Sequence, residues 1–473
     1  MNAIITTAVW GIVMMFGGVF IKSKTLPKYL AMLGVLIALA LNFAEQVNDK
    51  LLFEIDHHGM FAFSAFGYMF NNIAFICSLL FFMLNGRDVE KVGSNVSEYF
   101  ALIFFILCGV SLCTSFNTLL MLFLGIEIMS IPLYILTGSD KRNLKSNEAA
   151  LKYFLMGAFS TGIMLMGIAF IYGGNSTASF NISQINFGSS AGIPSLLAVG
   201  MVLLFISMSF KVSAAPFHFW VPDVYDGAPT VFTSFMATIV KTAAFVAFIR
   251  LFKSSFGSAS IQPQWQLLVV IVTVATMLFG NITAVFQQSV KRMLAYSSIA
   301  QAGFMLFALF AVSEAGSNRS AMAYEAMLVY STAYCLAGIG IFAILIKMND
   351  YTVDGFNGLA KKEPVLAVTA LVFLLSLTGI PLTAGFTGKF YMLLAAMHNG
   401  HYVWLIILAV LCTAISAYYY FRVIQAMFFK EPNPETTQVS DITTGFRLLL
   451  IITSVLIVLI GLFPEILLQW LFR

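Results

Sequence analysis

The dominant pattern of the sequence is a series of apolar stretches, separated by short polar segments, that recur from one end of the chain to the other. A helix needs about 20 apolar residues to cross the hydrocarbon core of a bilayer. The pattern therefore predicts an all-α polytopic membrane protein with about 14 transmembrane helices. The expected segments are 2–21, 28–45, 62–85, 97–115, 117–137, 149–173, 193–216, 228–252, 264–286, 293–313, 320–347, 364–393, 399–428 and 446–470.

Composition supports one continuous membrane domain. The chain has 473 residues, of which 60% are hydrophobic and 10% charged, whereas an average soluble chain has about 45–50% apolar and about 25% charged residues. The composition does not shift along the chain. The first apolar stretch lacks a basic leader and a small-residue cleavage site, so we expect a retained helix rather than a signal peptide. The net charge is only +4 without a basic run, so the expected partner is the lipid bilayer and not nucleic acid.

Lysine and arginine are distributed unequally between alternate loops. Positive residues are retained on the cytoplasmic side, and they gather in the odd-numbered loops, at Lys22, Lys24, Lys28, Arg87, Lys91, Lys141, Arg142, Lys145, Lys291, Arg292, Lys347, Lys361, Lys362, Lys430 and Arg447. The even-numbered loops hold Lys50, Arg250, Lys253 and Arg319, and Arg473 ends the chain. We therefore expect the odd loops to be cytoplasmic and both termini to lie on the outer, periplasmic side of a bacterial inner membrane.

An internal repeat is expected, because segments four to eight and nine to thirteen each form a block of five crossings. A block with an odd number of crossings returns upside down, which gives the inverted repeats of many transporters. The expected divisions are 1–95 (three N-terminal helices), 96–255 (first repeat), 256–430 (inverted second repeat) and 431–473 (C-terminal helix). In each block the fourth helix, the seventh and twelfth overall, carries prolines near a lysine. We expect these helices to be discontinuous, and two ordinary proline kinks are the alternative.

Charged residues inside the expected spans are the candidate functional residues, because an ionisable group in the bilayer costs several kcal/mol. Lys241 lies in the middle of its segment, too deep to reach the surface. Burial favours its neutral amine and a nearby carboxylate would favour its ammonium, so it is a candidate proton carrier, with a structural ion pair as the alternative. Glu127 also lies mid-span, and Lys211 is its best partner by depth. That pair is either part of a proton path or purely structural.

The remaining charged and polar candidates lie near the helix breaks or near the ends of their segments. Lys211 and Lys389 each adjoin an expected helix break, where water and carbonyl oxygens are available, and we expect both on a proton path. Lys152 lies about one turn from the cytoplasmic surface, so it is either a relay or a residue that extends to the headgroups. His218 follows Lys211 by seven residues and is either a relay or a core histidine. Arg422 is expected to contact lipid headgroups.

No motif for a cofactor is visible. Cys77, Cys108, Cys113, Cys335 and Cys412 are isolated in apolar stretches, so we interpret them as packing residues rather than as metal or cluster ligands. The sequence has no Walker A motif and no G-x-G-x-x-G after a predicted strand. We therefore expect no metal, nucleotide or redox centre in this chain.

Five motifs resemble the antiporter-like membrane subunits of respiratory complex I, the bacterial proton-translocating NADH:quinone oxidoreductase. They are Gly125–Glu127 (GIE), Leu151–Ser160 (LKYFLMGAFS), Phe210–Trp220 (FKVSAAPFHFW), Lys291–Gly303 (KRMLAYSSIAQAG) and Gly379–Lys389 (GIPLTAGFTGK). The resemblance covers about residues 95 to 430. One branch of the family usually has glutamate where this chain has Lys389, and another continues into a long lateral helix, so both differences favour a third branch.

The resemblance implies a fourteen-helix subunit in which Glu127, Lys211, Lys241 and Lys389 match the family's proton-path residues. It also implies that NADH, FMN, iron–sulfur clusters and quinone belong to partner subunits, and that this chain is a non-redox subunit of a translocase. Expected partners are other membrane-arm subunits, especially neighbouring antiporter-like and small membrane subunits. A multisubunit sodium/proton antiporter, which would show sodium-dependent transport, is the first rival. The second is a structural spacer, whose charges would serve assembly only.

Overall fold

The computed structural model describes residues 1–20, 23–48, 56, 58–185, 194–256, 262–311, 318–397, 402–432, 439 and 442–471. Lys22, Lys50 and Arg473, which entered the charge distribution above, lie outside the described residues. Within the described part, regular structure is helical, and the extended contacts are isolated bridges such as Phe61 with Phe116 and Ser289 with Thr352. The prediction of an all-α membrane protein is confirmed, with twelve helical stretches among the described residues long and apolar enough to cross a bilayer.

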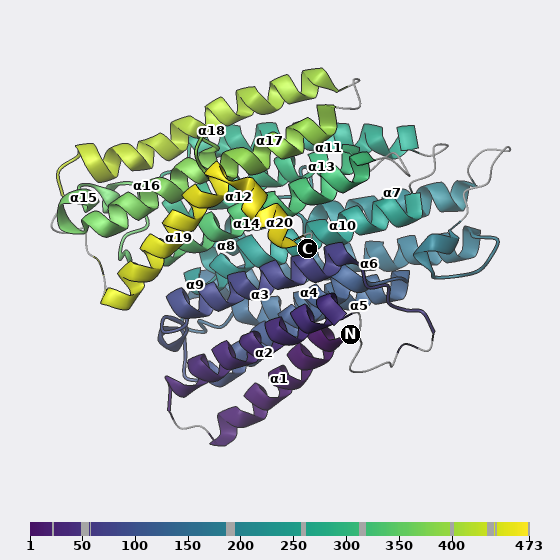
Figure 1. The fold of residues 1–473 in the computed structure, drawn as a ribbon, viewed down its shortest axis with the longest axis horizontal. Coiled ribbons are helices and arrows are strands. Elements are labelled where there is room, and N and C mark those ends of the chain that lie inside the picture. Colours follow the sequence, from purple (N-terminus) through teal and green to yellow (C-terminus); the bar gives the residue numbers. More distant parts are fainter. Residues whose placement is uncertain are drawn as a thin grey trace.

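The helices pack into one bundle whose long helices run roughly along a common direction (Figure 1). In the first half they are α1 (Asn2–Phe20), α2 (Leu26–Asn48), α3 (Ala65–Asn85), α4 (Val96–Ser115), α5 (Leu119–Thr137), α6 (Leu144–Gly174), α7 (Ser195–Lys211), α8 (Trp220–Gly227), α9 (Thr230–Phe235) and α10 (Lys241–Phe256). In the second half they are α11 (Gln262–Val285), α12 (Val290–Met305), α13 (Phe307–Ala311), α14 (Asn318–Lys347), α15 (Leu359–Lys362), α16 (Pro364–Thr378), α17 (Ala384–Met397), α18 (Val403–Phe429), α19 (Thr444–Leu462) and α20 (Pro464–Leu471). Short turns of 3₁₀-helix cover Val89–Lys91 (η1), Ile182–Gln184 (η2) and Asp354–Phe356 (η4), and a π-helix covers Met236–Val240 (η3).

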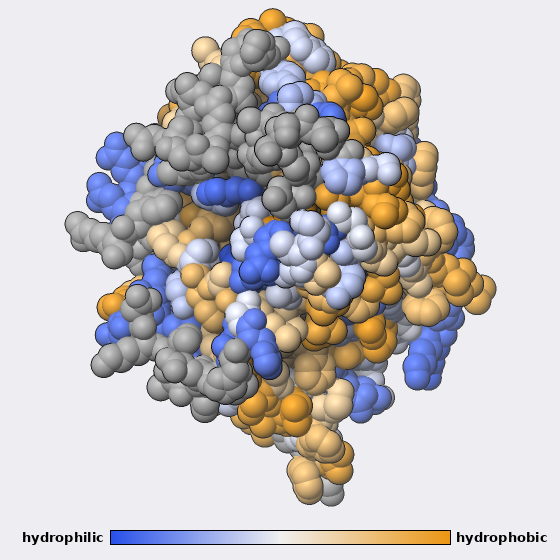
Figure 2. Space-filling model, turned by 90° about the vertical axis from the view of Figure 1, so that its right-hand side faces the viewer, coloured by the Kyte–Doolittle hydropathy of each residue, from blue (hydrophilic) through white to orange (hydrophobic). Residues whose placement is uncertain are grey.

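Burial separates central helices from peripheral ones. Helices α9, α10, α12 and the described part of α14 are almost wholly enclosed by the rest of the chain, whereas α1, α2, α18 and α19 leave most of their residues uncovered. Uncovered positions include large apolar side chains such as Phe16, Phe159 and Phe286, and hydrophobic residues gather along one flank in Figure 2. An apolar exterior of this kind requires lipid around it, so the polar residues of the central helices lie far from bulk water.

The two expected breaks have the same form. Helix α7 ends at Lys211 and α8 begins only at Trp220, while α16 ends at Thr378 and α17 begins at Ala384. The first connection contains Ser213 with a φ of 66°, and the second begins at Gly379 with a φ of 86°, a left-handed conformation that suits glycine. At the first break the connection itself pairs the last carbonyl groups of α7. At the second break the last carbonyl groups of α16, those of Leu377 and Thr378, accept from a side chain.

The π-helix before Lys241 was not predicted. The expected span 228–252 is occupied by α9, η3 and α10, and the wider turn ends directly at Lys241. Such π-helical turns are frequent at functional sites. Hydrophobic periodicity cannot reveal one, because a single extra residue per turn barely alters the pattern of a helix that is apolar on all sides.

Gly280 permits α11 and α12 to lie in contact. A Cβ at this position would lie 2.6 Å from the backbone nitrogen of Ala300, whereas a Cβ at Gly162 would have no atom within 4 Å. We expect Gly280→Ala to force the two helices apart and to destabilise the fold by about 1–3 kcal/mol. The unfolding midpoint of the purified complex should fall in Gly280→Ala and stay unchanged in the matched Gly162→Ala variant. Equal midpoints would show that this helix contact is not tight.

Candidate functional site

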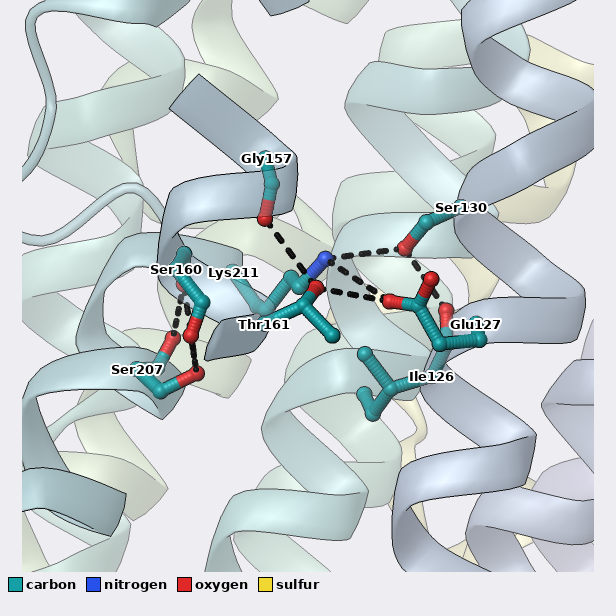
Figure 3. A network of polar contacts seen from close by, with 8 residues as sticks. All are labelled: Ile126, Glu127, Ser130, Gly157, Ser160, Thr161, Ser207 and Lys211. Atoms are coloured by element: carbon teal, nitrogen blue, oxygen red, sulfur yellow. Dashed lines mark hydrogen bonds and ion pairs between the residues drawn. The ribbon is translucent and has the colours of Figure 1, made fainter. Parts of the chain in front are cut away.

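Glu127 and Lys211 face each other between α5 and the end of α7, as expected from their depth. Lys211 Nζ lies 3.9 Å from Glu127 Oε1 and donates a hydrogen bond of 3.0 Å to Ser130 Oγ. Thr161 of α6 donates to the same oxygen, Glu127 Oε1, at 2.7 Å. Figure 3 shows the ammonium pointing between Ser130 and Glu127. The carboxylate is thus hydrogen-bonded to Thr161 and only loosely paired with Lys211, and a small movement would tighten the ion pair.

The position of Lys211 follows from the break that it precedes. It is the last residue of α7, where the negative end of the helix dipole favours a cation. Trp220, at the start of α8, donates its indole N–H to the carbonyl of Phe210 at 3.2 Å. That bond joins the two sides of the break and fixes the place at which α7 stops.

Lys241 is enclosed at the centre of the bundle. Its side chain is 2% exposed, and Nζ donates to the carbonyl and the hydroxyl of Ser298 at 3.1 and 2.8 Å. The ring of Tyr225 lies 5.6 Å from the same nitrogen. Within the described residues no carboxylate lies within 4.0 Å of Nζ, so its polar partners are neutral oxygens.

Lys389 has the same character at the second break. It is 6% exposed, and Nζ donates to the carbonyls of Leu377 and Thr378 at 3.1 and 2.9 Å. These are the final carbonyls of α16, which lack helical partners. The ring of Phe304 lies 4.4 Å from Nζ. As at Lys241, no carboxylate in the described part of the chain forms an ion pair with this lysine.

Helix α12 connects the environments of these two lysines. Ser298 contacts Lys241, and Gln301, one turn later, donates to the carbonyl of Leu377 at 2.8 Å, the same oxygen that accepts from Lys389. Tyr330 of α14 donates to Gln301 Oε1. A hollow of about 10 Å³ beside Gln301 and Lys389 has room for about one water molecule.

Ser298 and Gln301 were not predicted as candidates, although they lie in the Lys291–Gly303 motif that carries part of the resemblance. Thr161 and Ser130, which flank Glu127 and Lys211, were missed as well. Serine, threonine and glutamine are common in membrane helices, where they hydrogen-bond to the backbone or across helices. Only the three-dimensional contact with a buried lysine distinguishes these four.

Lys152 lies at the membrane edge and pairs with two carboxylates. Nζ is 2.8 Å from Asp223 Oδ2 and 2.8 Å from Glu148 Oε1, and Arg292 approaches Asp223 Oδ1 at 3.2 Å. These four residues line a hollow of about 200 Å³. Lys152 is therefore anchored at a polar inlet and makes no recorded contact with Lys211 within the described part of the chain.

His218 lies in the connection between α7 and α8 and is 5% exposed. Its ring stacks on Phe279 of α11 at a centroid distance of 5.9 Å, and Nδ1 has no hydrogen-bond partner among the described residues. A buried polar atom without a partner is costly. The ring is thus held by packing, with one nitrogen available to a water or a moving side chain.

Three cations differ from their expected settings. Arg422, expected at lipid headgroups, instead donates to the backbone carbonyls of Val285 and Gln287, because the end of α11 leaves these oxygens unpaired. Lys291 and Lys347, counted with the loops, are both buried within helices. Lys291 donates to the carbonyl of Asp226, in the last turn of α8, and to that of Ala228, directly after the helix.

The five cysteines are buried and unbonded, which confirms their interpretation as packing residues. Among the described residues no group of three histidine, cysteine, aspartate or glutamate side chains is placed to hold a metal ion. The buried acidic and basic residues of the described core are lysines with a few carboxylates and one histidine, surrounded by hydroxyl and amide groups.

Comparison with known proteins identifies the family. Residues 117–416 match the family described as NADH:quinone oxidoreductase/Mrp antiporter, transmembrane region. NADH-quinone oxidoreductase subunit N of Cytophaga hutchinsonii is 41% identical over 476 residues, which cover 99% of each protein. The chain belongs to the subunit N family of NADH-quinone oxidoreductase. It is a multi-pass membrane subunit of complex I, and its identity agrees with the branch that Lys389 indicated.

Solved structures support the same assignment. A chain of respiratory complex I from Thermus thermophilus with bound aureothin has a TM-score of 0.83 and 31% identity, with 99% of this chain and 98% of that chain covered. A chain of the Mrp complex from Dietzia sp. has a TM-score of 0.82 with 20% identity, and 99% and 94% are covered. The second likeness concerns the fold alone. Subunit N family members and Mrp proteins thus share one architecture.

Proposed function

We propose that this subunit moves protons outward across the membrane through Glu127, Lys211, Lys241 and Lys389, driven by redox chemistry in other subunits. The observation that carries the proposal is the pair of buried lysines, Lys241 and Lys389, whose polar partners within the described residues are neutral oxygens. Burial penalises the ammonium while these oxygens stabilise it. The two effects oppose each other, as a group that gains and loses a proton requires.

The proposed entry is the hollow beside Lys152, from which protons reach Lys211. The acidic groups of Asp223 and Glu148 attract protons to that inlet, and His218 is a candidate relay because its Nδ1 is unpartnered. Transfer toward Lys241 begins when Glu127, which already accepts from Thr161, moves farther from Lys211, because the ammonium then loses its anionic neighbour. An electrostatic change in an adjacent subunit supplies the force for that shift.

From Lys241 the proposed route follows α12 to the exit at Lys389. Ser298 accepts from Lys241, and Gln301 shares a carbonyl with Lys389 and lies beside room for about one water molecule. Glutamine cannot itself ionise, so its role is to hold that water and the Leu377 carbonyl in line. Gln301 is thus a positioning residue between two proton carriers.

The proposed topology has fourteen crossings. Two interrupted crossings, α7 with α8 and α16 with α17, are added to the twelve candidate spans. Each has a lysine beside its break. Residues 96–255 and 256–430 then form two inverted five-helix repeats, flanked by the helices of 1–95 and 431–473. Both termini face the outer side of a bacterial inner membrane, in agreement with the excess of lysine and arginine in the odd loops.

Cofactors and partners follow from the family. We place NADH, FMN, the iron–sulfur clusters and quinone in partner subunits, with neighbouring antiporter-like and small membrane subunits beside this chain. Its similarity to the Mrp chain keeps a sodium/proton antiporter as the second candidate, which differs in its requirement for sodium.

Inverted membrane vesicles in sodium-free buffer test this function through Gln301. Wild-type vesicles should acidify on addition of NADH, because the transported ion is the proton. Gln301→Leu should lower the rate about tenfold, because the water and the Leu377 carbonyl that Gln301 holds would no longer be aligned for transfer between the two lysines. Gln266→Leu, on α11 away from this contact, is the matched control. A requirement for sodium, or a full rate in an assembled Gln301→Leu complex, would contradict the proposal.

A further inference from the structure

A cavity unrelated to the lysine path opens at one end of the bundle. It has a volume of about 570 Å³ and lies between α2, the α3–η1 junction, the end of α14 and the start of α19. The neighbouring ends of α2, α3 and α19 appear on the left of Figure 1. Helix α2 begins at Leu26, α3 ends at Asn85, α14 ends at Lys347 and α19 begins at Thr444. Four candidate spans end here, so the cavity lies at the level of lipid headgroups.

Positive charge exceeds negative charge in the cavity lining. Its cations are Lys24, Lys28, Arg87, Lys91 and Lys347, and its carboxylates are Asp88 and Glu90. Asp88 is already engaged, because it is 2% exposed and lies 2.6 Å from Lys347 Nζ and 3.1 Å from Lys91 Nζ. Within the described residues Lys24 and Arg87 form no ion pair. The cavity therefore has unneutralised positive charge.

The start of α19 adds a second anion-attracting feature. Thr443, Gly445 and Phe446 line the cavity, and a Cβ on Gly445 would have no atom within 4 Å. Helix α19 has 19 residues, and its N-terminus carries the positive end of the helix dipole, with Thr443 Oγ1 accepting from the N–H of Phe446. A helix dipole and several cations, among them Lys28, which donates to the carbonyl of Met83 at 3.2 Å, thus border the same open space.

The remainder of the lining is apolar. Met32 of α2, Met83 and Leu84 of α3, and Phe446 and Leu449 of α19 form a wall below the cations. A soluble phosphate would leave this wall wet, whereas an acyl chain would cover it. The combination of a basic rim, a helix N-terminus and an apolar wall at the membrane surface matches a phospholipid rather than a free anion.

We propose that this cavity binds an anionic phospholipid, with the headgroup phosphate held by Lys28, Arg87 and the N-terminus of α19 and one acyl chain laid along Met32 and Leu449. The lipid bridges the N-terminal helices α2 and α3 to α14 and α19, which are joined there by the buried Asp88–Lys347 pair. It thereby fastens the N-terminal three-helix unit to the C-terminal part of the subunit.

A photoactivatable phosphatidylglycerol, with a diazirine in its acyl chain, tests the site in the purified intact complex. Mass spectrometry should find label on the segments that contain Met32 and Leu449. The double variant Lys28→Gln/Arg87→Gln should lower labelling there about 30-fold, the effect expected from loss of two cations near an anionic headgroup. Lys141→Gln/Arg142→Gln removes the same charges from an exposed loop between α5 and α6 and should label normally.

Two further experiments distinguish an anionic phospholipid from other ligands of the cavity. A phosphatidylcholine probe of the same chain length should label the site much more weakly, and inorganic phosphate at millimolar concentration should not compete. Equal labelling by both lipids, full competition by phosphate, or undiminished labelling in the double variant would each overturn the proposal. If the double variant fails to assemble, Lys24→Gln, at an exposed lysine ahead of α2, replaces it and should reduce labelling about fivefold.

Discussion

Lys389→Arg should assemble into a complex of normal stability that no longer moves protons through this subunit. Arginine retains a positive charge and hydrogen-bond donors for the carbonyls of Leu377 and Thr378, so the end of α16 stays satisfied. The guanidinium group does not lose its proton in proteins. A permanently charged guanidinium can therefore fulfil a structural role of Lys389, but it cannot release and take up a proton. The part of NADH-driven vesicle acidification that depends on this subunit should fall about 100-fold.

Two companion variants make this result specific. Lys389→Leu removes both the charge and the donors, so it should lower the unfolding midpoint as well as transport. Lys253→Arg, at a half-buried lysine near the end of α10, changes the same residue type outside the path and should leave both properties unchanged. Normal acidification by an assembled Lys389→Arg complex would show that the side chain serves structure alone.

Much of the fold could be predicted, because the signal for a membrane helix is strong. Each of the fourteen expected segments overlaps at least one helix of the structure, and the prolines and glycines near Lys211 and Lys389 marked both interruptions. What hydropathy could not supply was local detail. The π-helix before Lys241 and the separation of α12 from α13 at Leu306 do not change the number of apolar residues, so no periodicity reports them.

The candidate site was predictable only where a residue is expensive to bury. Glu127, Lys211, Lys241 and Lys389 stand out because a charge in lipid needs a reason. Ser298 and Gln301 cost little in a helix, since a neighbouring backbone carbonyl satisfies them, and therefore gave no signal. Asp223 and Asp88 were overlooked for a different reason. They lie near helix ends, where acidic residues are common. Only their ion pairs with Lys152 and Lys347 show that each has a specific partner.

Cations near the membrane edge were the least predictable. Counting lysine and arginine residues in alternate loops predicts the orientation of the protein in the membrane, but the count does not distinguish one loop cation from another. Arg250 shows the limit of that approach. It was counted in an even-numbered loop, yet its guanidinium donates to the carbonyls of Phe116, Thr114 and Ala62 and so ties α10 to the α4–α5 connection. Such clamps depend on which carbonyl groups lack a partner, and this follows from tertiary structure alone.

Lys241 bears most directly on the central claim, because it is enclosed on all sides and has Ser298 as its hydrogen-bond partner. Methionine at 241 fills a similar volume without a titratable group, and Lys253→Met on the same helix is the matched control. The decisive measurement is the rate of NADH-driven proton translocation by purified, fully assembled complex in proteoliposomes. A fall of at least about tenfold in Lys241→Met, with Lys253→Met normal, is the predicted result. A Lys241→Met complex that translocates protons at the wild-type rate would contradict the account.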